Sequence, residues 1–362
     1  FGGTGKTTAE MMSATTFSTP GWSIASTGFT GAAPPANTWL ILNGQTRPML
    51  RAEWSTNLNT PHQLQLMATA LDGAYTQISN IDLNEGMNNA AEIWGTNRSA
   101  SSGAGFVPVG GFASNFIGSF DGNGYTISNL VIYQPSQVDD LGLFGATGAA
   151  TITNAGLINA SITGGWGFSN GPLVGWTGVS GATSISNSYS LNGTVVIQAG
   201  NAGGLVGGTD FNLWGSTIND SYASGSVTAL FTHGGTVGTG GLVGRNRSTI
   251  NNSYSFADVT SADYEGGFVG YNEGTITNSY SSGEVVQTST RPVGGFIGVN
   301  TGGITASFWD TDTSNQAVGV GTDFIGGDVT GGCFTGTCTN GGAANLSALA
   351  TYTGAGWSIT ST

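Results

Sequence analysis

The sequence has very little charge. Only 7% of its 362 residues are Asp, Glu, Lys or Arg, and a single lysine accompanies six arginines, so that the formal net charge is −13. A chain with so few cations offers no basic surface for phosphate groups, which argues against nucleic acid as a partner. No apolar run approaches the roughly 18 residues of a membrane-spanning helix, and we expect no membrane insertion.

Cysteine and histidine are almost absent. Cys333 and Cys338 lie in the segment GGCFTGTC, and His62 and His233 are far apart in the sequence. Four intervening residues permit a small disulfide loop, which we predict; a redox pair or a metal site is the alternative, and a metal site needs more ligands. A disulfide implies an oxidising compartment outside the cytoplasm. Each histidine is expected to be a surface or turn residue.

Long amphipathic helices are also missing. A helical period is visible only over residues 60–71, whereas glycine accounts for 63 residues. Gly and Asn tolerate positive φ angles, so the composition favours β-structure with many tight turns. Neither an initiator methionine nor a signal peptide is visible at Phe1, and we expect a mature or excised piece of a protein.

The sequence repeats itself over residues 115–310. One repeated phrase is a glycine block: GLFG at 142, PLVG at 172, GGLVG at 203 and 240, GGFVG at 266 and GGFIG at 294. The glycines singled out in the last four copies are Gly204, Gly207, Gly241, Gly244, Gly267, Gly270, Gly295 and Gly298. The copies at 142 and 172 carry Leu141 and Pro172 in place of a doubled glycine. This departure predicts bent or interrupted coils there.

A second phrase follows each block, as in SISNSYS and TINNSYS, and YTISNLVIY at 125 is interpreted as an earlier copy. Its asparagine position is occupied, in order, by Asn129, Asn154, Asn187, Asp220, Asn252, Asn278 and Ala306. The spacings are 25, 33, 33, 32, 26 and 28 residues. Periods of this length with short β-type runs predict a solenoid. The composition excludes leucine-rich and helical repeats, which leaves an all-β fold, a parallel β-helix.

Equivalent residues of successive coils should lie above one another, about 4.8 Å apart. The apolar residues of the glycine blocks would include one inward stack, and the asparagines would turn the chain and hydrogen-bond along the stack. A second inward ladder would consist of Ile127, Ile152, Ile185, Ile218, Ile250, Ile276 and Ile304. A tyrosine stack would consist of Tyr189, Tyr222, Tyr254 and Tyr280, with Phe308 next in register.

These phrases resemble the GLUG-motif repeats of bacterial surface proteins. The segments HQLQLMATALDGAYTQISNIDL, FVPVGG and FIGSFDGNGYTISNLVI are similar to the part that precedes such repeats in filamentous-haemagglutinin-like adhesins. The resemblance covers nearly the whole chain. It implies a right-handed β-helix exported to the bacterial cell surface, with motif residues that are structural and not catalytic.

The two ends of the chain resemble each other. TFSTPGWSIAST at 16–27 matches TYTGAGWSITST at 351–362, which places Trp22 and Trp357 335 residues apart. We therefore expect residues 1–59 to be the end of a preceding module and linker, residues 60–310 the parallel β-helix, and residues 311–362 an exit linker and the start of the next module. No charged cap is visible at either end of the repeats, and exposed strand edges invite end-to-end stacking.

The opening GGTGKTT looks like a phosphate-binding loop. Such a loop must follow a strand and lead into a helix of a βαβ unit. Few helix-compatible residues follow Thr8, and the matching segment TNGGAANLSAL near the other end lacks the lysine. A turn rich in Gly and Thr is the better interpretation, and no cofactor is expected.

One weak candidate metal site is present. Asp310, Asp312 and Ser314 in WDTDTSNQ alternate like the start of a calcium loop, but the later Gly and Glu of that loop are missing. A solvated turn that ends the repeats is the preferred interpretation.

The leading hypothesis is a non-catalytic structural or adhesive module of an exported surface protein, in a tandem rod or a filament. Its partners would be neighbouring copies of itself and host or environmental glycans. The alternative is a carbohydrate-binding or carbohydrate-cleaving β-helix protein. Cleavage would need a pair of carboxylates such as Asp139 and Asp140, and binding could use Trp166, Trp176 or Trp214. The repeated positions are Asn, Ser and Tyr, which favours the structural hypothesis.

Overall fold

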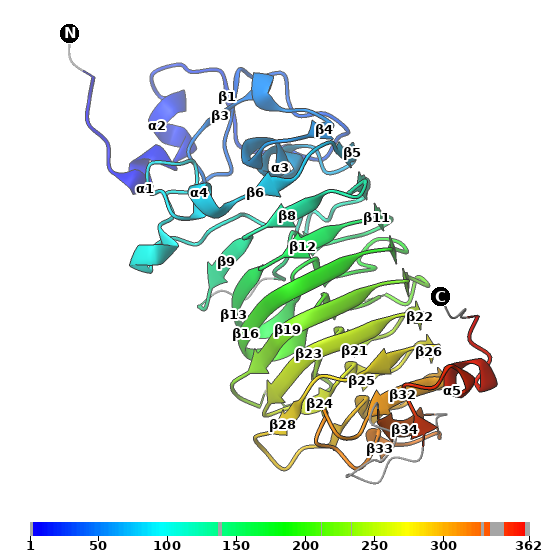
Figure 1. Cartoon of the computed structure of the whole chain (residues 1–362). Helices are drawn as coiled ribbons and strands as arrows, with labels where there is room; N and C mark the ends of the chain where they lie inside the picture. Colours follow the sequence, from blue (N-terminus) through cyan, green and yellow to red (C-terminus); the bar gives the residue numbers. More distant parts are fainter. Residues whose placement is uncertain are drawn as a thin grey trace.

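The protein is a stack of coils, as the computed structural model shows (Figure 1). The structure describes residues 3–136, 140–210, 212–232, 234–326, 329–333 and 344–358. Strands of successive coils pair in parallel and form three sheets that run along the stack. This architecture confirms the predicted parallel β-helix.

We name the three sheets by the residues that repeat in them. The isoleucine sheet consists of β4 (Asn57–Leu58), β5 (Ala74–Gln77), β7 (Ser119–Asp121), β11 (Thr151–Thr153), β15 (Ser184–Ser186), β18 (Thr217–Asn219), β22 (Thr249–Asn251), β26 (Thr275–Thr277) and β31 (Gly303–Thr305). The glycine sheet consists of β10 (Phe144–Ala146), β14 (Val174–Trp176), β17 (Val206–Gly208), β21 (Val243–Asn246), β25 (Val269–Asn272), β30 (Ile297–Asn300) and β33 (Val320–Asp323).

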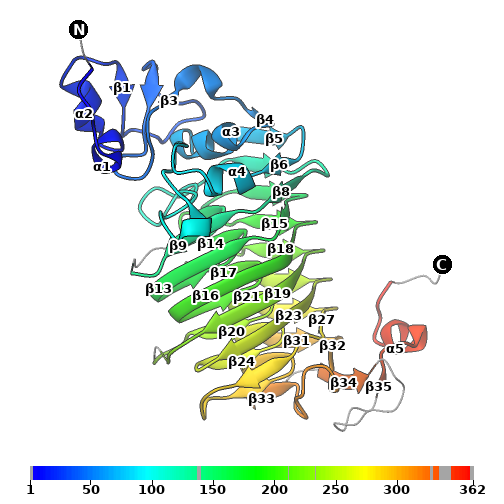
Figure 2. The same cartoon turned by 60° about the vertical axis from the view of Figure 1, so that its left-hand side comes forward.

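The tyrosine sheet contains the longest strands. It consists of β6 (Ile81–Asp82), β8 (Thr126–Ser128), β9 (Val131–Gln134), β12 (Gly156–Ile158), β13 (Ser161–Asn170), β16 (Tyr189–Gly203), β19 (Tyr222–Ala229), β20 (Gly238–Gly240), β23 (Tyr254–Ser261), β24 (Tyr264–Gly266), β27 (Tyr280–Ser281), β28 (Val285–Gln287), β29 (Val293–Gly294), β32 (Ser307–Asp310), β34 (Val329–Cys333) and β35 (Ala344–Asn345). One coil therefore runs through the isoleucine, tyrosine and glycine sheets in that order, as β15, β16 and β17 do (Figure 2).

The core is a column of apolar side chains between the sheets. In the isoleucine sheet, Ile152 pairs with Ile185, and the same register continues through the isoleucines of the next four coils to Ile304. In the glycine blocks, both apolar residues are fully buried, as Leu205 and Val206 illustrate. Burial of this surface is the main favourable term for a fold with so few charges.

Ile127 does not belong to the isoleucine ladder, which corrects the predicted register. Phe120 occupies the ladder position next to Ile152, and Ile127 pairs with Leu157 in the tyrosine sheet. The prediction failed because the phrase TISN at residues 126–129 and the phrase TITN at residues 151–154 are locally alike. They form different corners of successive coils.

Glycine permits close approach between backbones in the glycine blocks. A Cβ atom on Gly244 would lie 2.5 Å from the carbonyl oxygen of Gly207 and 2.6 Å from the amide nitrogen of Ala202. A Cβ atom on Gly204 would collide with the carbonyl oxygen of Gly241 in the next coil. Glycine is therefore required here by the narrow interior of the coil and not by a positive φ.

The glycine sheet is regular at residues 142 and 172. Phe144 pairs with Val174, and Val174 pairs with Val206, so the glycine sheet continues through both copies. The expected bend or interruption is absent from this sheet. A register shift does occur in the tyrosine sheet, between Trp166 and Ser169.

Short helices and a small sheet cover the N-terminal end of the stack. The helices are α1 (Thr8–Met11), α2 (Ala14–Ser18), η1 (Arg51–Glu53), α3 (Pro61–Leu66), η2 (Met67–Thr69), α4 (Asn84–Met87) and η3 (Arg98–Ala100), and the small sheet consists of β1 (Ile24–Ala25), β2 (Trp39–Leu40) and β3 (Met49–Leu50). Leu64, Met67 and Leu40 are fully buried in the same hydrophobic core as the coils. This end of the stack is therefore capped. The sequence analysis found no charged cap, and the cap that is present is built from apolar residues.

The stack continues beyond residue 310, where we had expected an exit linker. β33 pairs with β30, and β34 pairs with β32. A last helix, α5 (Leu349–Gly354), lies beside the final coils (Figure 1). Trp357 follows it and donates from Nε1 to the carbonyl oxygen of Ala306 at 2.8 Å.

Candidate functional site

The asparagine of the repeated phrase forms a left-handed corner. Asn187, Asn252 and Asn278 have φ angles of 49°, 50° and 51°. The same conformation occurs at Asn154, at Asp220 and, in the last copy, at Ala306. Asn and Asp adopt this conformation more readily than other residues with side chains. The corner lets the chain turn from the isoleucine sheet into the tyrosine sheet.

Asparagine side chains link some of these corners along the stack. The Nδ2 group of Asn252 donates to Asp220 at 3.2 Å, and that of Asn278 donates to Asn252 at 3.3 Å. Asn154 donates in the same way to Asp121 at 2.8 Å. Asn129 lies at a different corner, since its sheet position corresponds to that of Asn159; its side chain donates to Asp82 at 2.7 Å. Asn129 is therefore not a member of the series.

A buried serine follows five of the corners of the series, whereas Ala155 follows the corner at Asn154; the serines are Ser188, Ser221, Ser253, Ser279 and Ser307. The backbone amide of Ser221 donates to Oγ of Ser253 at 3.3 Å, and Ser188, Ser253 and Ser279 continue the chain of amide-to-hydroxyl bonds. Each hydroxyl donates in turn to the carbonyl oxygen two residues earlier, as Ser253 does to Asn251 at 2.7 Å. The serines thus satisfy backbone groups at a turn where strand pairing is interrupted.

The tyrosines form a continuous stack on the outside of the coil. Ring centroids are 5.0 Å apart for Tyr189 and Tyr222, 4.7 Å for Tyr222 and Tyr254, and 5.1 Å for Tyr254 and Tyr280, with interplanar angles of 14° or less. Phe308 pairs with Tyr280 in the sheet register. Burial raises the pKa of the Tyr254 and Tyr280 hydroxyls, and the neighbouring tyrosine adds to the effect.

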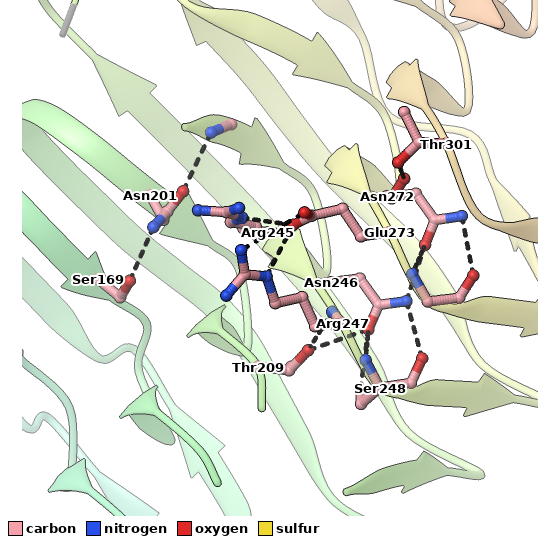
Figure 3. A network of polar contacts seen from close by, with 12 residues as sticks. Ser169, Asn201, Thr209, Arg245, Asn246, Arg247, Ser248, Asn272, Glu273 and Thr301 are labelled. Atoms are coloured by element: carbon pink, nitrogen blue, oxygen red, sulfur yellow. Dashed lines mark hydrogen bonds and ion pairs between the residues drawn. The ribbon is translucent and has the colours of Figure 1, made fainter. Parts of the chain in front are cut away.

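A second amide ladder lies inside the glycine sheet, and the sequence analysis missed it. Thr209 donates to Asn246, Asn246 to Asn272, and Asn272 to Asn300, over 2.8–3.0 Å. Figure 3 shows the part of this ladder around Asn246 and Asn272. All three asparagines are fully buried. The sequence signal for this ladder was an asparagine two positions after the last glycine of the block, in VGRN, VGYN and IGVN.

Two arginines converge on one carboxylate beside this ladder (Figure 3). Nε of Arg245 lies 2.7 Å from Oε2 of Glu273, and Nε of Arg247 lies 2.8 Å from the same oxygen. Burial alone would raise the pKa of Glu273, but the two guanidinium groups outweigh burial and lower the pKa. The cluster has one more positive charge than negative.

The glycines of the blocks take different roles within each coil. Gly241 and Gly267 lie against the backbone of the next coil, at Gly267 and Gly295 respectively. Gly270 and Gly298 lie against the interior backbone near Gly238 and Glu265, as Gly244 does near Ala202. Gly295 departs from this pattern because the Trp309 ring occupies the space in which its Cβ would stand.

The weak calcium candidate, residues 310–314, is a turn that Asp310 closes by hydrogen bonds. Oδ1 of Asp310 accepts the backbone amides of Asp312 at 2.9 Å and Thr313 at 3.2 Å. Asp310 and Ser314 are 2% and 0% exposed, whereas Asp312 is half-buried and Thr313 is exposed, so the turn is solvated on one side only. Among the residues that the structure describes, no group of three or more His, Cys, Asp and Glu side chains is arranged to hold a metal ion.

Three residues that the sequence analysis named lie outside the described part of the chain. They are Cys338, His233 and Asp139, so the candidate carboxylate pair of Asp139 and Asp140 stays a prediction. Cys333 ends β34. The disulfide between Cys333 and Cys338 therefore stays a prediction.

The opening segment forms a short capped helix. Thr7 caps α1, which has four residues, and Lys6 pairs with Glu10 at 3.2 Å. A phosphate-binding loop would direct its lysine towards a ligand at the end of a longer helix. The geometry agrees with the interpretation as a turn.

His62 forms a clasp in the N-terminal cap that the sequence analysis also missed. Its Nδ1 lies 2.7 Å from Glu53, and its Nε2 lies 2.9 Å from Glu92. Burial lowers the pKa of His62, but the hydrogen bonds to Glu92 and Glu53 outweigh it and the pKa is raised. The hydrogen bond from His62 lowers the pKa of Glu92. Because both ring nitrogens face carboxylates, the ring cannot activate a hydroxyl nucleophile in this geometry.

Two of the three tryptophans named as binding candidates are exposed. Trp166 is 48% exposed and stacks on Phe231 with ring centroids 5.6 Å apart, and Trp214 is 55% exposed. Trp176 lies in the glycine sheet at the position that Arg245 occupies two coils later.

None of the helices in the described part of the chain is long and apolar enough to cross a membrane.

These repeated features identify a known motif. Residues 266–286 match the GLUG motif. Over 155 residues, or 41% of the chain, the sequence is 39% identical to halomucin from Haloquadratum walsbyi. The aligned part spans 2% of the length of halomucin. The chain therefore contains a GLUG motif and resembles halomucin over part of its length. Neither match names a filamentous haemagglutinin, so that resemblance stays a prediction.

A solved structure shares the fold. A candidate immunoglobulin A1 protease from Bacteroides ovatus superposes with a TM-score of 0.55 at 19% identity, over 75% of this chain and 84% of that chain. Another solved structure, described as an IgA1 protease, gives a TM-score of 0.49 at 14% identity, over 75% of this chain and 21% of that chain. At such low identity the first match shows the β-helix fold alone, and the second carries no argument.

Proposed function

We propose that the chain is a non-catalytic structural module of an exported cell-surface protein, and that it forms one repeat of a long tandem rod that carries adhesive surfaces. The observation that carries this proposal is the unbroken series of equivalent side chains through successive coils. Isoleucine, serine, tyrosine and asparagine occupy the same positions coil after coil. Such positions are used for stacking, which leaves few free for catalysis.

Tandem repetition is supported by a duplicated structural unit. The helix α2 with Trp22 and the helix α5 with Trp357 have the same local geometry. The Phe17 and Trp22 rings lie 5.0 Å apart at 48°, and the Tyr352 and Trp357 rings lie 5.0 Å apart at 46°. The glycine before each tryptophan has a φ of about 90°. The small share of halomucin that the alignment covers is also consistent with such segments being parts of very long chains.

A carbohydrate-binding or carbohydrate-cleaving role is the second candidate, and the exposed aromatic and half-buried arginine side chains favour binding over cleavage. The name of the structural neighbour also raises cleavage of immunoglobulin A1. The His62 clasp speaks against a nucleophilic mechanism in the described part of the chain, because its two ring nitrogens already contact carboxylates. The repeated Asn and Ser side chains supply no general acid, and burial raises the pKa of the stacked Tyr254 and Tyr280, which makes them weaker acids.

Surface labelling of the producing cells tests the structural proposal. Antibodies raised against this chain should bind intact cells, and an immunoblot of the denatured protein should show a band far above 36.5 kDa. Purified chain should leave immunoglobulin A1 and polysaccharides uncut over prolonged incubation. Labelling only after cell lysis would contradict export, a band near 36.5 kDa would contradict the tandem rod, and specific cleavage products would contradict the non-catalytic role.

A further inference from the structure

A surface of arginine and tyrosine lies outside the glycine sheet in the last regular coils. The guanidinium of Arg291 lies over the Tyr264 ring, 4.9 Å from its centroid. The Tyr264 and Tyr271 rings are 5.6 Å apart, and the guanidinium of Arg245 lies 5.6 Å from the centroid of Tyr271. We call these four residues the arginine–tyrosine face. They form one continuous series of contacts although they come from three coils.

This face is positive on an acidic molecule. At and beside this face, the three arginines Arg245, Arg247 and Arg291 stand against the carboxylates of Glu273 and Asp323, which gives three minus two, or +1, whereas the chain as a whole carries −13. Among the described residues, Arg291 forms no ion pair. The neighbouring carboxylate of Asp323 accepts a hydrogen bond from Asn300 at 2.9 Å. A cation placed on an aromatic ring and left without a carboxylate can take an anionic ligand.

The face borders a cavity of about 500 Å³. Tyr264, Tyr271 and Arg291 line it together with the hydroxyl-bearing residues Thr236 and Thr290. Phe324 forms another wall and is 69% exposed. The cavity therefore combines aromatic surface, hydroxyl groups and a guanidinium in a space that suits one or two sugar rings.

We propose that the arginine–tyrosine face binds carboxylate-bearing sugar units of an acidic polysaccharide. A pyranose ring has apolar C–H groups on its faces, which can pack on Tyr264, Tyr271 and Phe324. Its hydroxyl groups match the threonines, and its carboxylate matches the planar donor fork of Arg291. This inference goes beyond the structural role proposed for the stack and does not depend on tandem repetition.

An acidic peptide would satisfy the arginine but makes less use of the site. The lining combines flat aromatic surface, hydroxyl groups and the guanidinium, which match the apolar ring face, the hydroxyl groups and the carboxylate of a sugar acid. We therefore commit to the saccharide and treat the peptide as an outcome of the test.

Calorimetric titration of the whole chain with short oligogalacturonate tests the proposal. We expect saturable binding that weakens as salt is added, and no binding of the same oligosaccharide after methyl esterification of its carboxylates. Arg291→Gln should weaken binding at least about tenfold. The matched control is Arg98→Gln, because Arg98 lies 4.0 Å over the Tyr133 ring at the other end of the stack and its loss changes the net charge equally. Arg98→Gln should bind as the parent does.

A second pair of variants covers the case in which Arg291→Gln perturbs folding. Phe324→Ala removes an exposed wall of the cavity, and Val318→Ala removes an exposed side chain, 52% accessible, that does not line it. Only Phe324→Ala should weaken binding. Equal binding of the esterified oligosaccharide, equal loss in Arg98→Gln, or equally tight binding of polyglutamate would each overturn the proposal. Surface labelling and chain length would be unaffected by that result.

Discussion

At the scale of the residue, the left-handed backbone conformation of the corner determines which residue types are favourable there. Ala306 has a φ of 49° at a position that other coils fill with Asn or Asp. A left-handed conformation costs an alanine on the order of 1 kcal/mol, which glycine avoids. We expect Ala306→Gly to stabilise the protein by about 1 kcal/mol and Asn252→Ala to destabilise it by about as much. Urea unfolding measures both, and a stabilising Asn252→Ala would contradict the role of the corner.

Glu265 gives a second prediction at this scale. It is 1% exposed, and burial raises the pKa of its carboxyl to about 8, with the neighbouring Asp263 adding to the effect. Because the folded-state pKa lies above the ordinary value of 4.5, the folded protein is favoured at low pH. That stability is lost as pH rises towards 8. Glu265→Gln should remove the loss, which is on the order of a few kcal/mol.

Thermal melts between pH 5 and pH 9 check the Glu265 prediction. Over this range, the parent protein should melt at progressively lower temperature while Glu265→Gln changes much less. Parallel curves for the two proteins would show that the carboxyl is not held in a low-dielectric site.

At the scale of the element, the narrow coil interior depends on glycine. A methyl group on Gly244 would meet two neighbouring backbones at less than 3 Å, so β21 or its neighbours must move. We expect Gly244→Ala to cost about 2–4 kcal/mol. Gly111→Ala is the matched control, because no atom lies within 4 Å of its Cβ position and its φ is not positive. Equal melting temperatures for the two variants would contradict the packing argument.

The His62 clasp is the second prediction at the element scale. It joins α3 to Glu53 in η1 and to Glu92 after α4. The raised pKa of His62 adds stability that is full below the ordinary value of 6.5 and lost as pH rises through the raised value. The lowered pKa of Glu92 adds stability that is present above 4.5 and lost as pH falls. The clasp is therefore strongest between about pH 4.5 and 6.5.

Replacement of the histidine tests this clasp. His62→Gln should destabilise the cap by about 1 kcal/mol in that window, because the three side chains are about one-third exposed, and by less at pH 9. Hydrogen exchange of α3 reports the change locally. Lys6→Gln, which breaks an exposed ion pair, should leave α3 unaffected. At each pH the variant is compared with the parent, because the intrinsic rate of exchange itself rises with pH; a larger loss of protection relative to the parent at pH 9 than at pH 5.5 would contradict the clasp.

At the scale of the whole molecule, the N-terminal cap protects the first strand edge of the stack. Leu64 lies in α3 with no exposed surface. Leu64→Asp would bury an unpaired carboxylate, displace the cap and expose the edge at β4 and β5. We expect this variant to associate with increasing concentration, as measured by light scattering. Ile78→Asp, at a site 43% exposed, should remain like the parent. Equal association of both variants would show that the cap has no such role.

The sequence by itself determined the repeated part of the fold. A period near 30 residues, with the same residue types in each copy, leaves a stack of parallel strands as the arrangement that buries every isoleucine and glycine block. The same reasoning anticipated helical residues near 60–71, where α3 and η2 lie. Local chemistry was enough because each coil contacts mainly its neighbours.

Only the tertiary structure decided which corners align and which side chains meet across coils. TISN at residue 126 and TITN at residue 151 are locally alike, and strand pairing alone assigns them to different corners. The His62 clasp joins residues 9 and 30 positions away in the sequence, and the arginine–tyrosine face joins three coils. Such contacts depend on how loops of unequal length close each coil, and sequence spacing does not encode that closure.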